Sequence, residues 1–229
     1  MISINHCILC GSPHSSRELC QYCQQAIISQ YLGCYQCAEP LTDDFIRIPE
    51  GLICGRCQNQ RPAFDHTLTA GLYQAPLSNL LHNYKFHKRI ELSLLLSQML
   101  LHKIIHTSKE QMPHGLVAIP LHKTRLKQRG YNQALIIARF LSKKLKIPLL
   151  LNQVVRNKNT IEQSSLKYKQ RIINLKNAFN IRGDFPPRIA IIDDIVTTGC
   201  TVNALARKLK DQGIKHIDIW AIAKTPQIK

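Results

Sequence analysis

The stretch IAIIDDIVTTGCT, residues 189–201, decides the fold of this 229-residue chain. Its first four residues are apolar, which is typical of a parallel strand that is covered on both faces. Two adjacent carboxylates, Asp193 and Asp194, end that run, and a turn rich in hydroxyl groups leads into a helical pattern over 201–212. Ligands of open α/β sheets bind beyond the carboxyl ends of the strands. The stretch therefore predicts an α/β fold with a ligand site at this strand end.

The turn after the acidic pair offers the groups that hold a phosphorylated sugar. Its hydroxyls and backbone N–H groups can surround a terminal phosphate at the positive end of a helix, and Gly199 leaves room for the ligand. Asp193 and Asp194 can accept hydrogen bonds from ribose hydroxyls and can steady a hydrated Mg2+. A helix cap alone would need one such residue, so it does not explain two acids followed by this turn. The predicted site consists of Asp193, Asp194, Val196, Thr197, Thr198, Gly199, Cys200 and Thr201.

Strand-like runs alternate with helical patterns from about residue 65 onward. We expect strands at 67–73, 115–119, 148–155, 188–192 and 216–223, and helices at 76–87, 91–106, 132–144 and 201–212. Residues 165–179 are expected to form a basic amphipathic helix or a pair of turns. This alternation predicts a mostly parallel sheet with right-handed crossovers and flanking helices, built from residues 63–229.

Residues 1–62 form a separate cysteine-rich segment, for which we expect a helix at 24–32 and a hairpin at 45–53. Eight of the nine cysteines form four Cys-x-x-Cys pairs: Cys7/Cys10, Cys20/Cys23, Cys34/Cys37 and Cys54/Cys57. Two such pairs complete one tetrahedral site, so the segment predicts two structural Zn2+ ions in a double zinc-ribbon module. The pairing is open between a sequential and a crossed arrangement. A disulfide framework would suit a secreted chain, and a redox pair would not need four copies.

Closed all-thiolate sites leave no open metal position, so we expect the module to serve as a scaffold or docking surface. The ninth cysteine, Cys200, reads as a small loop residue rather than as a nucleophile. The net charge is +17, and residues 63–229 alone carry 27 basic and 9 acidic residues. Such a field favours polyanions, although a solvated basic surface remains an alternative. No membrane span or signal peptide is visible, which predicts a cytoplasmic protein.

The acidic pair and the Thr-Thr-Gly-Cys-Thr turn resemble the signature of the phosphoribosyltransferases. Together with the cysteine pairs, the chain resembles the ComF family, which includes ComFC and GntX-like proteins. The similarity extends to Pro120-Leu121-His122, to Arg125 and to Gln128-Arg129-Gly130-Tyr131-Asn132-Gln133-Ala134, where Tyr131 replaces the usual Phe. A third block is Gln163, Leu166, Arg171, Asn174, Ala178 and Phe179.

This resemblance implies a type I phosphoribosyltransferase-like fold and binding of 5-phosphoribosyl-1-pyrophosphate (PRPP) with Mg2+. It also implies a role in natural competence, in DNA uptake or in the use of imported single-stranded DNA. Residues 120–133 would form the pyrophosphate loop, with Leu121, His122, Arg129 and Gly130 as binding groups, although a lone His is more often structural. The residues expected to act in catalysis are Asp193, Asp194 and Arg129. Residues 156–171 are either a lid or an exposed connector.

Two classes of function remain open. The first is a transferase that displaces pyrophosphate from ribose with a nitrogen nucleophile, although no residue identifies the acceptor base. The second is a non-catalytic DNA-binding adaptor that uses the pocket as a sensor, because the basic portion would attract phosphates. Its expected DNA contacts are Lys143, Lys144, Lys146, Lys158, Lys167 and Lys169. The zinc module could in addition dock a helicase or another competence protein.

Overall fold

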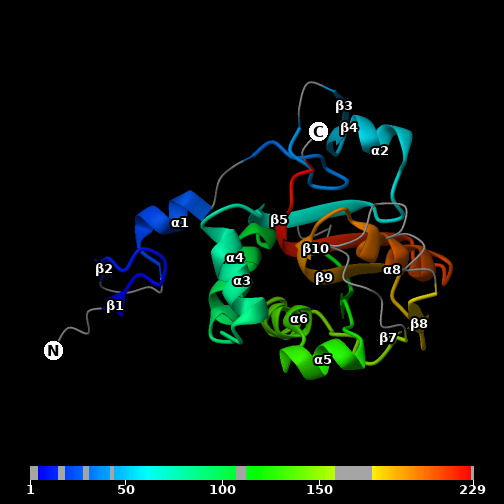
Figure 1. Cartoon of the computed structure of the whole chain (residues 1–229). Helices are drawn as coiled ribbons and strands as arrows, with labels where there is room; N and C mark the ends of the chain where they lie inside the picture. Colours follow the sequence, from blue (N-terminus) through cyan, green and yellow to red (C-terminus); the bar gives the residue numbers. More distant parts are fainter. Residues whose placement is uncertain are drawn as a thin grey trace.

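A computed structural model describes residues 5–14, 19–27, 31–41, 44–106, 112–157 and 177–227. Its centre is a parallel sheet with the strand order β5-β10-β9-β6 (Figure 1). The strands are β5 (His66–Leu72), β6 (Gly115–Ala118), β9 (Arg188–Val196) and β10 (His216–Lys224). The predicted α/β class with a mostly parallel sheet is therefore confirmed.

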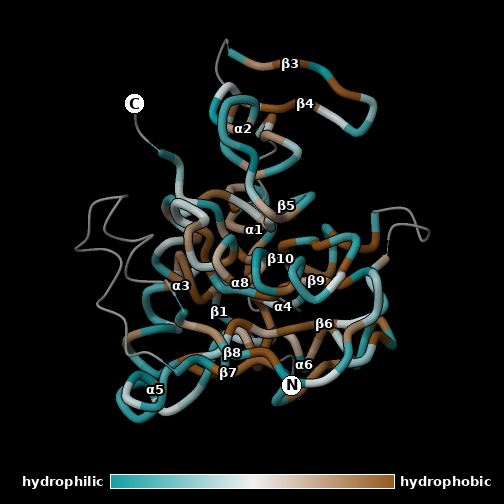
Figure 2. The backbone as a smooth tube through the Cα atoms, turned by 90° about the vertical axis from the view of Figure 1, so that its right-hand side faces the viewer, coloured by the Kyte–Doolittle hydropathy of each residue, from teal (hydrophilic) through white to brown (hydrophobic). Residues whose placement is uncertain are grey.

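Helices cover both faces of this sheet, as Figure 1 shows. They are α3 (Leu77–Phe86), α4 (Leu92–Ile104), α6 (Gln133–Leu145) and α8 (Cys200–Lys210), whereas α5 (Lys123–Arg129) lies outside them. The apolar faces of α3, α4 and α6 pack against Ala190 and Ile192 of β9, whereas α8 packs against Ile189 and Ile191 on the opposite face. Alternate residues of β9 thus fill two cores, which is why the strand is apolar without alternation. In Figure 2 the sheet is mostly hydrophobic and α5, which buries no residue, is mostly hydrophilic.

The cysteine-rich segment contributes short elements on both sides of the sheet. They are β1 (Asn5–His6), β2 (Pro13–His14), α1 (Gln21–Ile27), β3 (Phe45–Ile48), β4 (Gly51–Cys54) and α2 (Gly55–Asn59). Cys7 and Cys23 share a core with α3, whereas Cys34, Cys37 and Cys57 share a core with α8.

The second half of the cysteine-rich segment is bonded to strand β5. The backbone N–H of Thr67 donates to the carbonyl of Tyr35 at 3.1 Å, and the hydroxyls of Tyr31 and Thr69 lie 2.8 Å apart. The rings of Tyr35 and His66 stack at 4.3 Å. These contacts attach the segment to the free side of β5.

Most predicted elements lie within two residues of their predicted bounds, but several differ from the prediction. Residues 148–155 do not form one strand: Leu149 makes a single bridge to Leu116, and the chain then turns at Asn152, whose φ is 61°. It continues as β7 (Val154–Arg156), which pairs antiparallel with β8 (Phe179–Ile181). Residues 165–176 of the predicted helix or pair of turns, 165–179, lie outside the described residues, but Phe179 belongs to a strand.

Two further differences concern helices. The predicted helix 24–32 is observed as α1, which begins at Gln21 and ends at Ile27. The predicted pyrophosphate loop, 120–133, contains the short helix α5, because His122 caps its N-terminus and Gly130 ends it in the left-handed region. Its binding role stays a prediction. Strand β9 also continues past the acidic pair to Val196, since Ile195 and Val196 pair with β10. In the described part of the chain no helix is both long and apolar enough to cross a bilayer.

Candidate functional site

The junction of β9 and α8 forms the centre of the candidate site. Asp193 and Asp194 lie near the C-terminal end of strand β9, and residues 197–199 connect the strand to the helix. Gly199 has φ 78° and ψ 0°, a left-handed conformation that costs an L side chain about 1–2 kcal/mol. The glycine therefore permits the abrupt turn from strand to helix.

The first turn of α8 has backbone N–H groups available for a ligand. No side chain caps the helix, and within the described residues none of the N–H groups of 198–202 donates a hydrogen bond. These groups carry the positive end of the helix dipole. Thr198 lies beside them, with its hydroxyl 3.1 Å from the sulfur of the buried Cys200. Cys200 is thus the first residue of the helix rather than a loop residue.

The two carboxylates of the motif have different surroundings. Asp194 is buried, and its Oδ1 lies 2.9 Å from Nζ of Lys85 on α3. Asp193 is half-buried, and its Oδ1 accepts a hydrogen bond from the backbone N–H of Asp194 at 2.8 Å. Burial and then the charge of Asp194 raise the pKa of Asp193 well above its usual range. Asp194 is therefore held by an internal cation, whereas Asp193 is the group that gains most from an added cation.

One buried arginine lies within electrostatic range of Asp193. Arg156 of β7 is buried, and its guanidinium lies 5.6 Å from the ring centre of Phe179. Burial, followed by the charge of Arg125, lowers the pKa of Arg156 to about 10, while the charge of Asp193 acts in the opposite direction. Arg156 thus interacts electrostatically with Asp193, and Arg125 interacts with Arg156.

The segment 120–133 packs next to α3. The guanidinium of Arg129 lies 5.6 Å from the ring centre of Phe86, the residue after Lys85. The hydroxyl of Tyr131 donates to the carbonyl of Tyr84, a contact that the usual Phe would lack. Leu121 and His122 are half-buried and Gly130 is exposed. His122 accepts a hydrogen bond from the N–H of Thr124 at 3.3 Å, so here it serves as a helix cap.

A chain of polar contacts joins the β9–α8 loop to the second set of cysteines. Nζ of Lys224 donates to the carbonyl of Thr197 at 2.8 Å and lies 2.7 Å from Oε2 of Glu39. Arg56 lies 3.8 Å from the same carboxylate oxygen and donates to the sulfur of Cys37 at 3.6 Å. Lys224 is only 1% exposed, and burial lowers its pKa, an effect that Glu39 opposes. The position of Thr197 thus depends on a contact with the cysteine-rich segment.

The eight paired cysteines gather in two sets, and both follow the sequential arrangement. The first set is Cys7, Cys10, Cys20 and Cys23, and the second is Cys34, Cys37, Cys54 and Cys57. The sulfurs of each set lie within 4.8 Å of one another, and those of Cys10/Cys20 and Cys37/Cys54 are 3.7 Å apart. Tetrahedral thiolates on Zn2+, at about 2.3 Å from the metal, would be about 3.8 Å apart. Each set could therefore hold one zinc ion.

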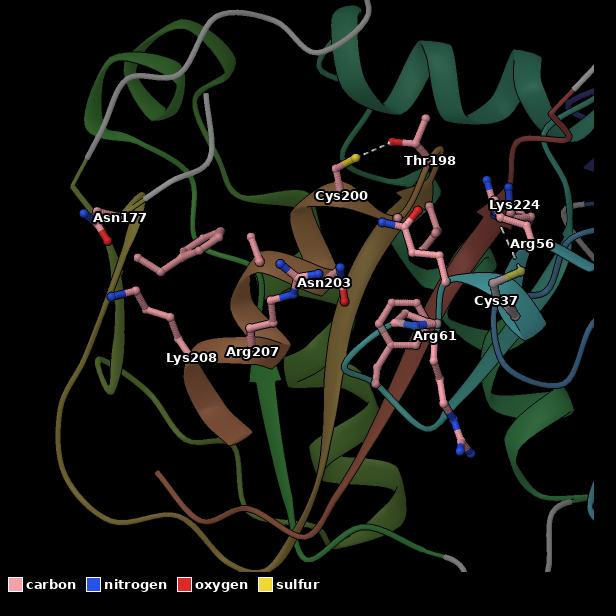
Figure 3. A pocket seen from close by; sticks show the side chains of 18 residues that line it. Cys37, Arg56, Arg61, Asn177, Thr198, Cys200, Asn203, Arg207, Lys208 and Lys224 are labelled. Carbon is pink, nitrogen blue, oxygen red and sulfur yellow. Dashed lines mark hydrogen bonds between the residues drawn. The ribbon is translucent and has the colours of Figure 1, made fainter. Parts of the chain in front are cut away.

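A cavity of about 400 Å3 opens beside the N-terminal part of α8 (Figure 3). One part of its wall is formed by Thr198, Gly199 and Cys200. Another part is formed by Cys37 and Cys57 of the second cysteine set. Asp193, Asp194, Thr197 and Thr201 are not among its lining residues. The cavity thus touches the loop from the side of α8.

A scan against models of protein families finds no match. The chain is 34% identical over 227 residues to competence protein F of Haemophilus influenzae, covering 95% of this chain and 96% of that protein. It is 33% identical over 225 residues to the DNA utilization protein YhgH of Escherichia coli strain K12, covering 96% of both. The chain belongs to the ComF family. The competence protein ComFC of Bacillus subtilis is 34% identical to this chain over 100 residues, which cover 43% of this chain and 39% of ComFC.

The lysines predicted to contact DNA divide into two groups in this ComF-family protein. Lys143, Lys144 and Lys146 are exposed at the C-terminal end of α6, where Nζ of Lys144 lies 5.9 Å from the ring centre of Phe140. Lys158, Lys167 and Lys169 lie outside the described residues, as do Gln163, Leu166, Arg171 and Asn174 of the third family block and the whole range 158–176.

Four residues near the loop had no recognisable signal in the sequence. Lys85 and Lys224 each occupy an ordinary position in a helix or strand, and Arg156 was expected in a connector. Glu39 lies two positions after Cys37. Its role as the partner of Lys224 becomes visible only in the tertiary structure.

Proposed function

We propose that this ComF-family protein binds PRPP with Mg2+ at the β9–α8 junction and acts in competence or DNA utilization. The observation that carries the proposal is the first turn of α8, whose N–H groups donate no hydrogen bond within the described residues. They follow closely on the end of β9, which carries Asp193 and Asp194. A helix N-terminus favours a phosphate, and neighbouring carboxylates favour the hydroxyls of its sugar.

Each part of the ligand would contact a different group. The loop 197–201 would hold the 5-phosphate through backbone N–H and hydroxyl groups, and Asp194, fixed by Lys85, would accept from ribose hydroxyls. Asp193 fits a hydrated Mg2+, because a cation would offset both its burial and the charge of Asp194. When bound, Mg2+ would neutralise charge on the pyrophosphate.

Transfer would break the bond between the anomeric carbon and the pyrophosphate oxygen and form a bond to a nitrogen nucleophile. Negative charge then develops on pyrophosphate, and Arg129 and Arg156 are the cations that could stabilise it. The acceptor is not specified by any residue, so binding is the primary proposal and turnover is its extension.

The biological role is supported by the names of the relatives, a competence protein and a DNA utilization protein. We propose that single-stranded DNA is a partner, that a competence protein such as a helicase docks on a zinc-loaded module formed by residues 1–62, and that the protein acts in the cytoplasm. The alternative of a non-catalytic adaptor is favoured by the charge of the chain, +17, and by the exposed lysines at the end of α6. Pyrophosphate release with candidate bases distinguishes the transferase from the adaptor.

Calorimetric titration with PRPP and Mg2+ tests the binding proposal. We expect saturable binding by the wild-type protein and at least about a tenfold loss of affinity in Asp193→Asn, because a charge-assisted contact contributes about 1.5–3 kcal/mol. Asp211→Asn is the matched control, since this exposed residue lies at the opposite end of α8. Absence of binding by the wild-type protein, or equal affinity of Asp193→Asn and wild type, would reject the site.

A further inference from the structure

The cavity beside α8 is built by parts of the chain that are distant in sequence. Asn203, Arg207 and Lys208 come from α8, and Gln60, Arg61 and Phe64 come from the segment that joins the second cysteine set to β5. Figure 3 shows Arg207 and Asn203 on the helix with Arg61 across from them. Its volume, about 400 Å3, is at the small end of ligand pockets, which span about 300–1,000 Å3. It suits one small ligand or one unit of a polymer rather than a folded partner.

The lining of this cavity is strongly basic. Five lining side chains are Lys or Arg and none is Asp or Glu. Arg56 and Lys224 are paired with Glu39. By contrast, Arg61, Arg207 and Lys208 form no ion pair or side-chain hydrogen bond with any residue that the structure describes. Three uncompensated cations on one concave surface favour an anionic ligand.

The remaining lining distinguishes among anions. Pro62 and Ala204, which are half-buried, contribute apolar surface, whereas Phe64 and Phe179 are only 3% and 2% exposed. Gln60, Asn177 and Asn203 add carboxamides, and the Asn203 oxygen accepts from the N–H of Ala63 at 2.7 Å, which leaves its NH2 group for a ligand. An inorganic anion would need neither apolar surface nor carboxamides, and an apolar ligand would not need three cations. A flat heterocycle with a polar edge and a phosphate uses all three kinds of group.

We propose that this cavity binds a nucleotide, either free or as one unit of a single strand. Its phosphate would contact Arg61, Arg207 and Lys208, and its base would lie against the apolar part of the wall at Pro62 and Ala204. This site is separate from the proposed PRPP site, because it requires neither the acidic pair nor Mg2+, and in its strand form it rests on the proposed partnership with single-stranded DNA. It meets the β9–α8 loop only where Thr198, Gly199 and Cys200 share the wall.

Fluorescence anisotropy of the full chain with a labelled oligothymidylate tests this site, with unlabelled dTMP as the competitor. We expect Arg61→Gln/Arg207→Gln to weaken strand binding by about ten- to a hundredfold, because each arginine removes a charge-assisted contact. Both residues are exposed, so the variant should fold, which circular dichroism checks. The control Arg139→Gln/Lys215→Gln removes the same charge from exposed positions outside the cavity and should change affinity by less than about threefold.

The outcomes separate the two sources of the nucleotide. Displacement of the strand by dTMP would show that a free nucleotide fills the cavity, and strand binding that dTMP does not displace would show that a polymer is required. Equal loss in the two double variants, or no binding of either probe at low salt, would overturn the proposal. Testing each variant with both ligands distinguishes the two sites. The Arg61→Gln/Arg207→Gln variant should retain its affinity for PRPP, and Asp193→Asn should retain its affinity for the strand. Strand binding without any PRPP binding would reject only the PRPP part of the proposed function.

Discussion

Replacing Lys224 by Met should detach the β9–α8 loop from the second cysteine set. The side chain is 1% exposed, and its amine contacts Oε2 of Glu39 at 2.7 Å and the carbonyl of Thr197 at 2.8 Å. Removing one member of a buried ion pair leaves the other charge uncompensated and destabilises by about 3–5 kcal/mol. Glu39 is 14% exposed and still has Arg56 at 3.8 Å, which partly compensates its charge. We therefore expect Lys224→Met to lower the free energy of unfolding by about 3 kcal/mol, the lower end of this range.

Urea unfolding of a double-mutant cycle measures this contact. Lys224→Met/Glu39→Gln removes both charges, so it should lose only about 1–2 kcal/mol relative to wild type, and the two single changes should not add. PRPP affinity should fall in Lys224→Met and stay low in the double variant, because Thr197 has lost its anchor in both. Lys215→Met is the control, since Lys215 is exposed at the opposite end of the sheet. If the changes in the free energy of unfolding of the two single variants add up to that of the double variant, the reasoning is refuted. A Lys224→Met variant as stable as the Lys215→Met control would also refute it.

Three further predictions concern the loop, its acid and the two cysteine sets. Gly199→Ala should lower the free energy of unfolding by about 1–2 kcal/mol through its φ of 78°, because a new Cβ would meet Phe64 only at an ordinary 3.8 Å; urea unfolding measures this loss, and an unchanged midpoint would contradict it. The pKa of Asp193 is raised from 3.8 to about 8, so the folded protein binds this proton more tightly than the unfolded chain does. The resulting stabilisation is complete below pH 3.8 and is lost as the pH rises to about 8. Wild-type stability should therefore fall across that range relative to Asp193→Asn, as urea titrations at several pH values would show; parallel curves would contradict it. Cys34→Ser should lower PRPP affinity more than Cys10→Ser, because only the second set is linked to Thr197; equal losses in titrations of both variants would contradict it.

The sequence was sufficient to predict the strand–turn–helix of the site, because its signals are local. Buried β-branched residues, two acids and a glycine at a forced turn occur within residues 189–201. The cysteine sets were equally local, since each Cys-x-x-Cys pair defines its own turn. The pairing of the sets needed the structure.

The contacts that shape the loop could not be predicted in this way. Lys85 reaches Asp194, and Lys224 reaches Glu39, across parts of the chain that only the tertiary fold brings together. The strand predicted at 148–155 failed because its apolar run, Leu149, Leu150 and Leu151, is interrupted by a turn at Asn152 rather than paired along its length. Hydrophobic periodicity does not report how long a strand stays in register with its neighbour.

The attachment of Tyr31 and Tyr35 to β5 has a consequence for self-association. Outer strands expose unpaired backbone groups that recruit other chains, and proteins commonly cover them. Here the cover is the segment carrying Cys34 and Cys37, whose backbone accepts from Thr67. A variant in which the second cysteine set is disrupted, such as Cys34→Ser, should therefore expose the edge of β5 and aggregate through it, even while the helices on both faces of the sheet remain packed.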